Sequence, residues 1–217
     1  VYKRILAMHA NNQLGKPKKE YTSAIKIVLS VSGAAAVGKT TFCKELAEFL
    51  INQGYSVTHI QLDGYLKTRE ERKQIQKSLS GYDPKASNLS KLIKDMQDII
   101  YNSKTIQIPI YDHSTGKTDT SITVKPSEII ILDGVMSLQD EIRTKFTNFS
   151  VFLYSNAATL KELRLRADIS DRGYSRSAAM AHSEDEFSSY AKWVHPQIQS
   201  ADLKIYVNRD RTIRVAE

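Results

Sequence analysis

The segment VSGAAAVGKTTF, residues 31–42, contains Gly33, then four residues, then the sequence Gly-Lys-Thr. This is the G-x-x-x-x-G-K-[ST] spacing of a Walker A phosphate-binding loop, in which backbone N–H groups and a lysine surround phosphate oxygens. The glycines let the backbone approach the phosphates without Cβ atoms in the way, and the start of a helix adds a favourable dipole. The segment therefore predicts a nucleotide site formed by Gly33, Ala34, Ala35, Ala36, Val37, Gly38, Lys39, Thr40 and Thr41.

The residues around this loop provide the context that the motif requires. The preceding run IKIVLSV, residues 25–31, is short and apolar, which is typical of a buried parallel strand. Residues 39–53 place apolar side chains at helical spacing, and Gly54 is a stop signal. Residues 55–62, YSVTHIQL, predict a second strand, and the strand–helix–strand order requires the two strands to be parallel.

The alternation of strands and helices continues through the rest of the chain. Apolar runs and helical periodicity predict strands at 105–110, 127–134, 149–155 and 203–207, and helices at 89–102, 157–169 and 184–198. We therefore expect a three-layer α/β fold of the P-loop NTPase kind, with an open, mostly parallel sheet and helices on both faces. Such sheets bind their ligands at the carboxyl ends of the strands.

Length and composition limit the architecture. The chain has 217 residues, of which 41% are hydrophobic and 25% charged, and this fits one well-buried domain. We expect a leader segment at residues 1–24 and the folded domain at residues 25–217. There is no membrane-length apolar run and no signal-peptide pattern, and Cys43 is the only cysteine. These observations predict a cytoplasmic protein without a membrane partner and exclude an intramolecular disulfide.

The formal net charge of +7 raises the question of nucleic acid binding. Much of the excess lies at the two ends, with three lysines at positions 16–19 and three arginines at positions 209–214. Solvated ends, together with a few arginines around a small anionic ligand, explain the charge better than a nucleic acid surface does. We expect a small-molecule ligand and no nucleic acid partner; the sequence leaves a homo-oligomer open.

Two carboxylates follow predicted strands at the edge of the sheet where the phosphate loop lies. Asp133 comes after four apolar residues, a position from which it would hold Mg²⁺ together with the Thr40 hydroxyl, while Lys39 reaches the β- and γ-phosphates. Asp63 follows the second strand and would accept a proton from an attacking hydroxyl. Capping of the turn before Gly64 is the alternative role for Asp63.

Arginines form a third group near the end of a predicted helix. Arg164, Arg166 and Arg172 lie in LRLRADISDRGYSR, where the helix breaks at Asp171-Arg172-Gly173 into a polar segment. Such a segment predicts a lid that closes over bound phosphates, since the planar guanidinium binds phosphate oxygens in pairs. The alternative for Arg164 is an ion pair with Asp168 on the helix surface.

Several motifs carry a family resemblance when they are taken in order. The phosphate loop is followed by LDGYL, GYDPKASNL, IPIYDHSTG, VKPSEIIILDG, ADISDRG and SADLKIYV. This series resembles the phosphoribulokinase/uridine kinase family of P-loop kinases over about residues 25–207. The resemblance implies a nucleoside-monophosphate-kinase-like fold with a small lid, and transfer of the γ-phosphate of ATP to a hydroxyl group with the help of Mg²⁺.

The same resemblance assigns roles to individual residues. Asp63 matches the catalytic aspartate of the family, and with Lys39 and Arg172 it makes the expected catalytic set. Residues expected to bind the acceptor are Tyr65, Asp83, Tyr111, His113 and Arg164.

Other positions depart from both branches of the family. The turn 113–116, Tyr174 and His182 differ from the pattern of uridine kinases, whereas Gly64 and Leu66 differ from that of phosphoribulokinase. A nucleoside-like acceptor is the first hypothesis. A sugar phosphate and pantothenate are alternative acceptors, and a nucleotide-dependent binding or regulatory module without transfer activity is the alternative of another class.

Overall fold

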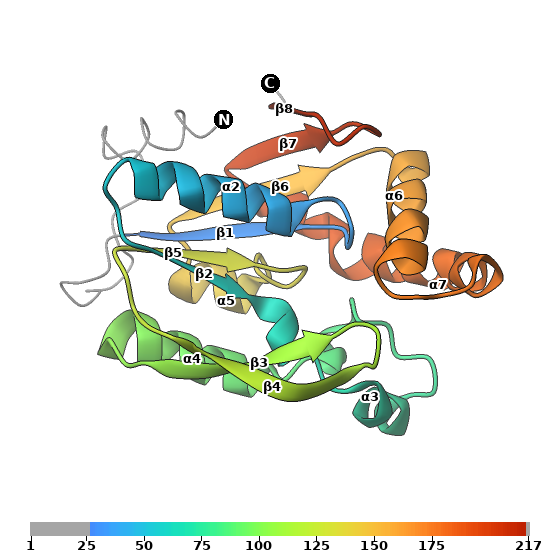
Figure 1. Ribbon diagram of the computed structural model, residues 1–217, viewed down its shortest axis with the longest axis horizontal. Helices are drawn as coiled ribbons and strands as arrows, with labels where there is room; N and C mark the ends of the chain where they lie inside the picture. The colour runs from blue at the N-terminus through green and yellow to red at the C-terminus, as the bar shows by residue number, and fades with distance from the viewer. Residues whose placement is uncertain (1–26, 216–217) are drawn as a thin grey trace.

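The computed structural model describes residues 27–215, except for the side chains of residues 182–184, so the expected leader lies outside the described part. Two sheets and their surrounding helices make up the described chain (Figure 1). The elements follow one another as β1 Ile27–Gly33, α2 Lys39–Asn52, β2 Val57–Gln61, η1 Leu62–Tyr65, α3 Arg69–Ile75, η2 Pro84–Ala86, α4 Leu89–Asn102, β3 Ile106–Asp112, β4 Lys117–Val124, β5 Ile129–Asp133, α5 Asp140–Phe146, β6 Phe149–Tyr154, α6 Ala157–Ser170, α7 Arg176–Trp193, η3 His195–Ser200, β7 Leu203–Val207 and β8 Ile213–Val215.

The main sheet has six strands in the order β2-β5-β1-β6-β7-β8. All neighbours are parallel except β8, which runs antiparallel to β7. Asp133 at the end of β5 is paired with Val31 of β1 on one side and with Gln61 of β2 on the other. The carboxyl ends of these three strands therefore meet at one place, and the expected mostly parallel α/β fold is confirmed.

Buried apolar side chains hold the helices to this sheet. Every residue of β1 and β5 is buried, as expected for strands covered on both faces. Helix α2 packs on β1, β2 and β5 through a stripe that includes Phe42, Leu46 and Leu50. Segment η3 contacts β1 and β6, where the Ser32 hydroxyl donates to Gln197 over 2.9 Å. The phosphate loop thus starts from a fully buried strand.

One predicted strand lies outside the main sheet. The run at 105–110 forms β3, which pairs antiparallel with β4 as a separate hairpin. The sequence analysis did not predict β4, because its side chains are nearly all exposed and it has no apolar alternation. Figure 1 shows the hairpin below the main sheet, beside α4. It forms a separate wall next to the main sheet.

The helix break predicted at residues 171–173 lies between α6 and α7. Helix α7 begins at Arg176 and not near residue 184, because Ser175 caps it by accepting a hydrogen bond from the amide of Ala178. The two helices pack against each other and stand at one end of the sheet (Figure 1).

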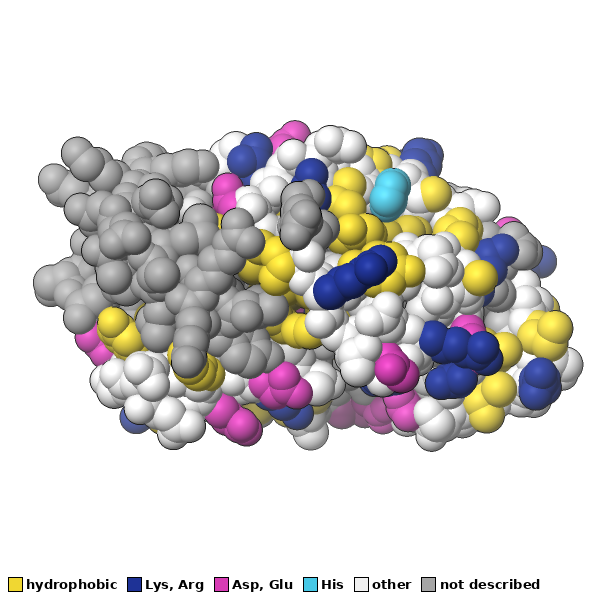
Figure 2. All heavy atoms as spheres, turned by 90° about the horizontal axis from the view of Figure 1, so that it is seen from above, with side chains coloured by type: hydrophobic (Ala, Val, Ile, Leu, Met, Phe, Trp, Pro, Cys, Tyr) yellow, Lys and Arg dark blue, Asp and Glu magenta, His cyan; other side chains and the backbone are white. Residues whose placement is uncertain are grey.

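On the face of the molecule seen from above, side chains of different types are mixed. In Figure 2, Lys and Arg side chains of the described residues are interspersed with hydrophobic, polar and acidic side chains. Among the described residues, no helix has the length and apolar character needed to cross a bilayer.

Candidate active site

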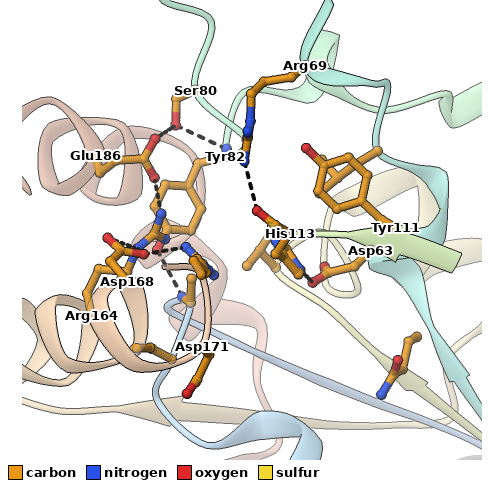
Figure 3. A pocket seen from close by; sticks show the side chains of 18 of the residues that line it. Asp63, Arg69, Ser80, Tyr82, Tyr111, His113, Arg164, Asp168, Asp171 and Glu186 are labelled. Atoms are coloured by element: carbon orange, nitrogen blue, oxygen red, sulfur yellow. Dashed lines mark hydrogen bonds and ion pairs between the residues drawn. The ribbon is translucent and has the colours of Figure 1, made fainter. Parts of the chain in front are cut away.

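A cleft of about 960 Å³ opens at the carboxyl ends of β1, β2 and β5. The phosphate loop forms its floor, η1 with α3 and the β3–β4 hairpin form one wall, and α6 with α7 form the other (Figure 3). The cleft brings together many of the residues that the sequence singled out: Ala35, Ala36, Gly38, Lys39, Thr40, Thr41, Asp63, Tyr111, His113, Asp133, Arg164 and Arg172.

The phosphate loop has the backbone that a phosphate cradle needs. Gly33 has φ +147°, and a Cβ there would lie 2.3 Å from the carbonyl oxygen of Leu153, so only glycine fits. Gly38 has φ +102° and precedes α2, whose N-terminus has no side-chain cap. The first N–H groups of α2 are therefore left to bind phosphate oxygens.

Lys39 lies at the end of this loop and is directed into it. Its ammonium group donates to the carbonyl oxygen of Ala34 over 2.9 Å, and the residue is 8% exposed. Burial lowers the pKa of Lys39, whereas the neighbouring charges of Asp133 and Asp63 act in the opposite direction. A bound triphosphate would supply negatively charged oxygens as partners for this buried ammonium group.

Thr40 and Asp133 form a pair of oxygen ligands beside the loop. The Thr40 hydroxyl donates to Oδ2 of Asp133 over 2.7 Å, and Asp133 is only 3% exposed. Mg²⁺ favours oxygen donors of this kind and is held by one or two protein ligands together with substrate phosphates. The donor set fits Mg²⁺, and the loop fits a nucleotide triphosphate.

Asp63 lies in η1, just beyond the end of β2, and faces the cleft. Nε2 of His113 lies 3.1 Å from Oδ2 of Asp63, and the two side chains are about 40% exposed. Desolvation raises the pKa of Asp63, but the hydrogen bond from His113 and the charges of Lys39 and Arg172 outweigh it, so the pKa lies below its ordinary value. Asp63 is thus ionised at neutral pH, as a proton acceptor must be.

The backbone of η1 is pressed against the hairpin. A Cβ on Gly64 would lie 2.1 Å from the carbonyl oxygen of Pro109 in β3, so the two main chains are in direct contact. The same contact brings Asp63 and His113, which are fifty residues apart in the chain, within hydrogen-bonding distance of each other. Sequence reasoning placed both residues near the acceptor but missed this pairing, since no local signal shows which strand lies beside η1.

Helix α3 adds cations to the same wall, which the sequence analysis also missed. Thr68 caps the helix in a capping box with Glu71. Arg69 donates to the carbonyl oxygen of His113 over 2.8 Å, and Arg72 donates to the Tyr111 hydroxyl over 2.7 Å. The Nε of Arg72 is buried without a hydrogen-bond partner in the described part of the chain.

The α6–α7 wall holds its arginines in ion pairs. Arg164 donates from Nε to both carboxylate oxygens of Asp168 over 2.9 Å and lies 3.4 Å from Glu186 of α7. Arg172, from the turn after α6, donates to the same Asp168 over 2.7 Å. The expected ion pair of Arg164 with Asp168 is present, but Asp168 is buried and the pair lines the cleft instead of lying on the helix surface (Figure 3).

Two residues expected near the acceptor have other partners. The Tyr65 hydroxyl donates to Asp95 of α4 over 3.0 Å and is buried, and the Asp83 carboxylate caps η2 by accepting from the Lys85 amide. Neither side chain lines the cleft, and their roles in acceptor binding stay predictions. Tyr82, which the sequence analysis did not select, does reach the loop, because its hydroxyl accepts a hydrogen bond from the Ala35 amide over 2.9 Å.

Comparisons with known proteins agree with this geometry. The model of the phosphoribulokinase/uridine kinase family matches residues 28–214. A phosphoribulokinase from Synechocystis sp. is 26% identical over 192 residues, which are 88% of this chain but only 56% of that protein. A uridine kinase from Brevibacillus brevis is 32% identical over 151 residues, or 69% of each chain.

A solved structure with the same fold is D-glycerate 3-kinase from Cryptococcus neoformans. It has a TM-score of 0.71 and 14% identity, and the alignment covers 99% of this chain and 97% of that one. At this level of identity the likeness concerns the fold alone.

Proposed function

The chain belongs to the phosphoribulokinase/uridine kinase family and is an ATP-dependent kinase that acts on a hydroxyl acceptor, and we propose that this acceptor is a small compound with an anionic group. Four cations support the proposal. Arg69, Arg72, Lys73 and Lys77, from α3 and the segment after it, all line the acceptor half of the cleft. Among the described residues, none of the four forms an ion pair.

Arg72 is the single observation that carries this proposal. Its guanidinium donates a hydrogen bond to the Tyr111 hydroxyl, and the guanidinium carbon lies 5.8 Å from the centroid of the Tyr111 ring. The buried Nε–H of Arg72, however, has no acceptor among the described residues. A buried donor without a partner is costly, and a carboxylate or phosphate oxygen would satisfy it in the two-point geometry that arginine favours. A neutral nucleoside offers no such charge.

The chain's own groups divide the work of transfer between the two walls. Asp63 accepts the proton of the acceptor hydroxyl, and His113 orients the Asp63 carboxylate. Lys39 and the first amides of α2 hold the transferring phosphate, while Arg172 offsets its developing charge. Thr40 and Asp133 would hold Mg²⁺, which supplies positive charge against the phosphate oxygens.

A second candidate acceptor is a neutral nucleoside. It is favoured by the uridine kinase of Brevibacillus brevis, at 32% identity. The turn 113–116 and Tyr174 argue against it, since they depart from the uridine kinase pattern and both regions lie at the cleft. The side chain of His182, a third departure, lies outside the described side chains.

Steady-state kinetics with saturating Mg-ATP test the proposal. We expect sugar phosphates or pantothenate to be phosphorylated, and uridine and cytidine to have KM values above the usual range of about 1 μM to 1 mM. In Arg72→Gln, the KM of the anionic acceptor should rise at least about tenfold, because one charge-assisted contact is lost, while the KM of Mg-ATP stays the same. Lys94→Gln, on the exposed side of α4, is the matched control for the lost charge. Efficient phosphorylation of uridine at a low-micromolar KM would instead establish the nucleoside.

A further inference from the structure

Three potential metal ligands of different chemistry lie together behind the phosphate loop. Cys43 comes from the first turns of α2, His59 from β2 and Asp133 from the end of β5. One ligand atom of each residue lies within 4.8 Å of the other two. Cys43 is a free and fully buried thiol, so its sulfur is held on the sheet side of α2, facing the other two groups.

The spacing of His59 and Asp133 fits a tetrahedral metal centre. Nε2 of His59 lies 3.2 Å from Oδ2 of Asp133. In a tetrahedral zinc site with bonds of about 2.0–2.1 Å to nitrogen and oxygen, two such ligands are separated by about 3.3 Å. The two atoms therefore already span one edge of the tetrahedron. With a zinc–sulfur bond of about 2.3 Å, the thiolate would stand about 3.6 Å from each of them, a short shift from its present position.

The combination of donors determines which cation fits. Thiolate and imidazole are soft or borderline ligands that favour zinc-like cations, whereas Mg²⁺ takes oxygen donors. We propose that Cys43, His59 and Asp133 bind a zinc-like divalent cation and that its binding inhibits the kinase. On binding, the Cys43 thiol releases its proton, and Nε2 of His59 gives up the proton that it shares with the Asp133 carboxylate, which leaves a neutral ring protonated on Nδ1 with Nε2 as the ligand. The fourth position is left for a water molecule.

Inhibition follows from a shared atom. Oδ2 of Asp133 is the oxygen that accepts the hydrogen bond from Thr40, and Asp133 is also the residue proposed for Mg²⁺. A cation held by the three residues would occupy this oxygen, which could then neither accept the hydrogen bond from Thr40 nor bind Mg²⁺. The binding part of the inference is independent of the proposed function, whereas the inhibition part rests on the assignment of Mg²⁺ to Thr40 and Asp133.

Co²⁺ is a direct probe for binding, because its thiolate complexes absorb in the near ultraviolet and the chain contains a single cysteine. We expect the purified full chain to show this charge-transfer band on addition of one equivalent of Co²⁺, and Zn²⁺ to abolish it by displacement. The band should be absent in Cys43→Ala and much weaker in His59→Gln. His195→Gln, which changes an exposed histidine far along the chain in η3, is the matched control and should keep the band.

Kinase assays at fixed Mg²⁺ test inhibition separately. We expect Zn²⁺ to inhibit the wild-type chain and the inhibitory concentration to rise at least about tenfold in Cys43→Ala, since loss of even an outer-shell partner of a metal ligand typically costs about 10–100-fold in affinity and Cys43 would be a direct ligand. A wild-type cobalt spectrum without a thiolate band overturns the proposal, whether or not the variants fold. A thiolate band with equal inhibition of wild type and Cys43→Ala would keep the site but overturn its effect on Mg²⁺.

Discussion

The floor of the cleft, which contains the phosphate loop and is called the nucleotide wall from here on, is built differently from the wall of α3 and the β3–β4 hairpin, which is called the acceptor wall. The wall that faces the nucleotide grows out of the main sheet, where all five residues of β5 are buried. The wall that faces the acceptor consists of α3, which buries no side chain, and of the hairpin, in which a single residue of β4 is buried. Packing thus fixes the first wall. In the second wall, β3 is packed into the core through Ile106 and Ile108, and hydrogen bonds such as Arg69 to His113 join α3 to the hairpin. A family can therefore retain one donor site while it changes acceptors.

The largest effect that we predict lies in the nucleotide wall. Lys39→Ala should lower kcat at least about a thousandfold and weaken Mg-ATP binding, because it removes an ammonium group aimed into the phosphate loop. Turnover and nucleotide titration by calorimetry measure both effects. Lys44→Ala, an exposed lysine of the same helix, is the control and should behave as wild type. Unchanged turnover in Lys39→Ala would remove the basis for the whole assignment.

The second prediction concerns Asp63, where the two walls meet. Asp63→Asn should lower kcat by about two to four orders of magnitude, the usual range for a lost general base, while Mg-ATP binds as before. Asp119→Asn, on the exposed face of the hairpin, should leave kcat unchanged. If Asp63→Asn lost ATP affinity in parallel with kcat, Asp63 would belong to the nucleotide wall and the division between the walls would be wrong.

The smallest effect lies in the acceptor wall, at the turn of the hairpin. Hydroxyl and amide donors of Ser114 and Thr115 lower the pKa of Asp112 to about 2. These hydrogen bonds form with the ionised carboxylate. They therefore stabilise the turn at pH values above the ordinary aspartate pKa of 3.8, and this stabilisation is lost as the pH falls through about 2.

An NMR titration of the Asp112 carboxyl carbon measures this pKa. Ser114→Ala should raise the midpoint toward 3.8, whereas Ser121→Ala, elsewhere on the hairpin, should leave it where it is. A wild-type midpoint near 3.8 would show that the turn is open in solution.

The same contrast explains what could be predicted from the sequence. The phosphate loop, Lys39 and Thr40 are consecutive in the chain, and Asp133 ends an unmistakably buried strand, so local pattern was enough. The acceptor wall depends on contacts across long sequence separations, such as Asp63 with His113. Here the sequence analysis named both residues from the family resemblance but could not derive their pairing.

Two other features lacked any usable sequence signal. The charged segment of α3 has the pattern of a solvated helix, and only the fold shows that Arg69 and Arg72 point into the cleft. Strand β4 is polar on both faces, and its place in a hairpin follows from β3 and not from its own side chains. Such elements are recognised only when their neighbours are known.

The contact of Gly64 with Pro109 has a mechanical consequence. Because the main chain of Gly64 lies directly against the Pro109 carbonyl, the η1 segment that carries Asp63 is packed tightly against the hairpin. We therefore expect any shift of the hairpin to carry Asp63 along with it. An acceptor held by the hairpin would then stay at the same distance from the Asp63 carboxylate.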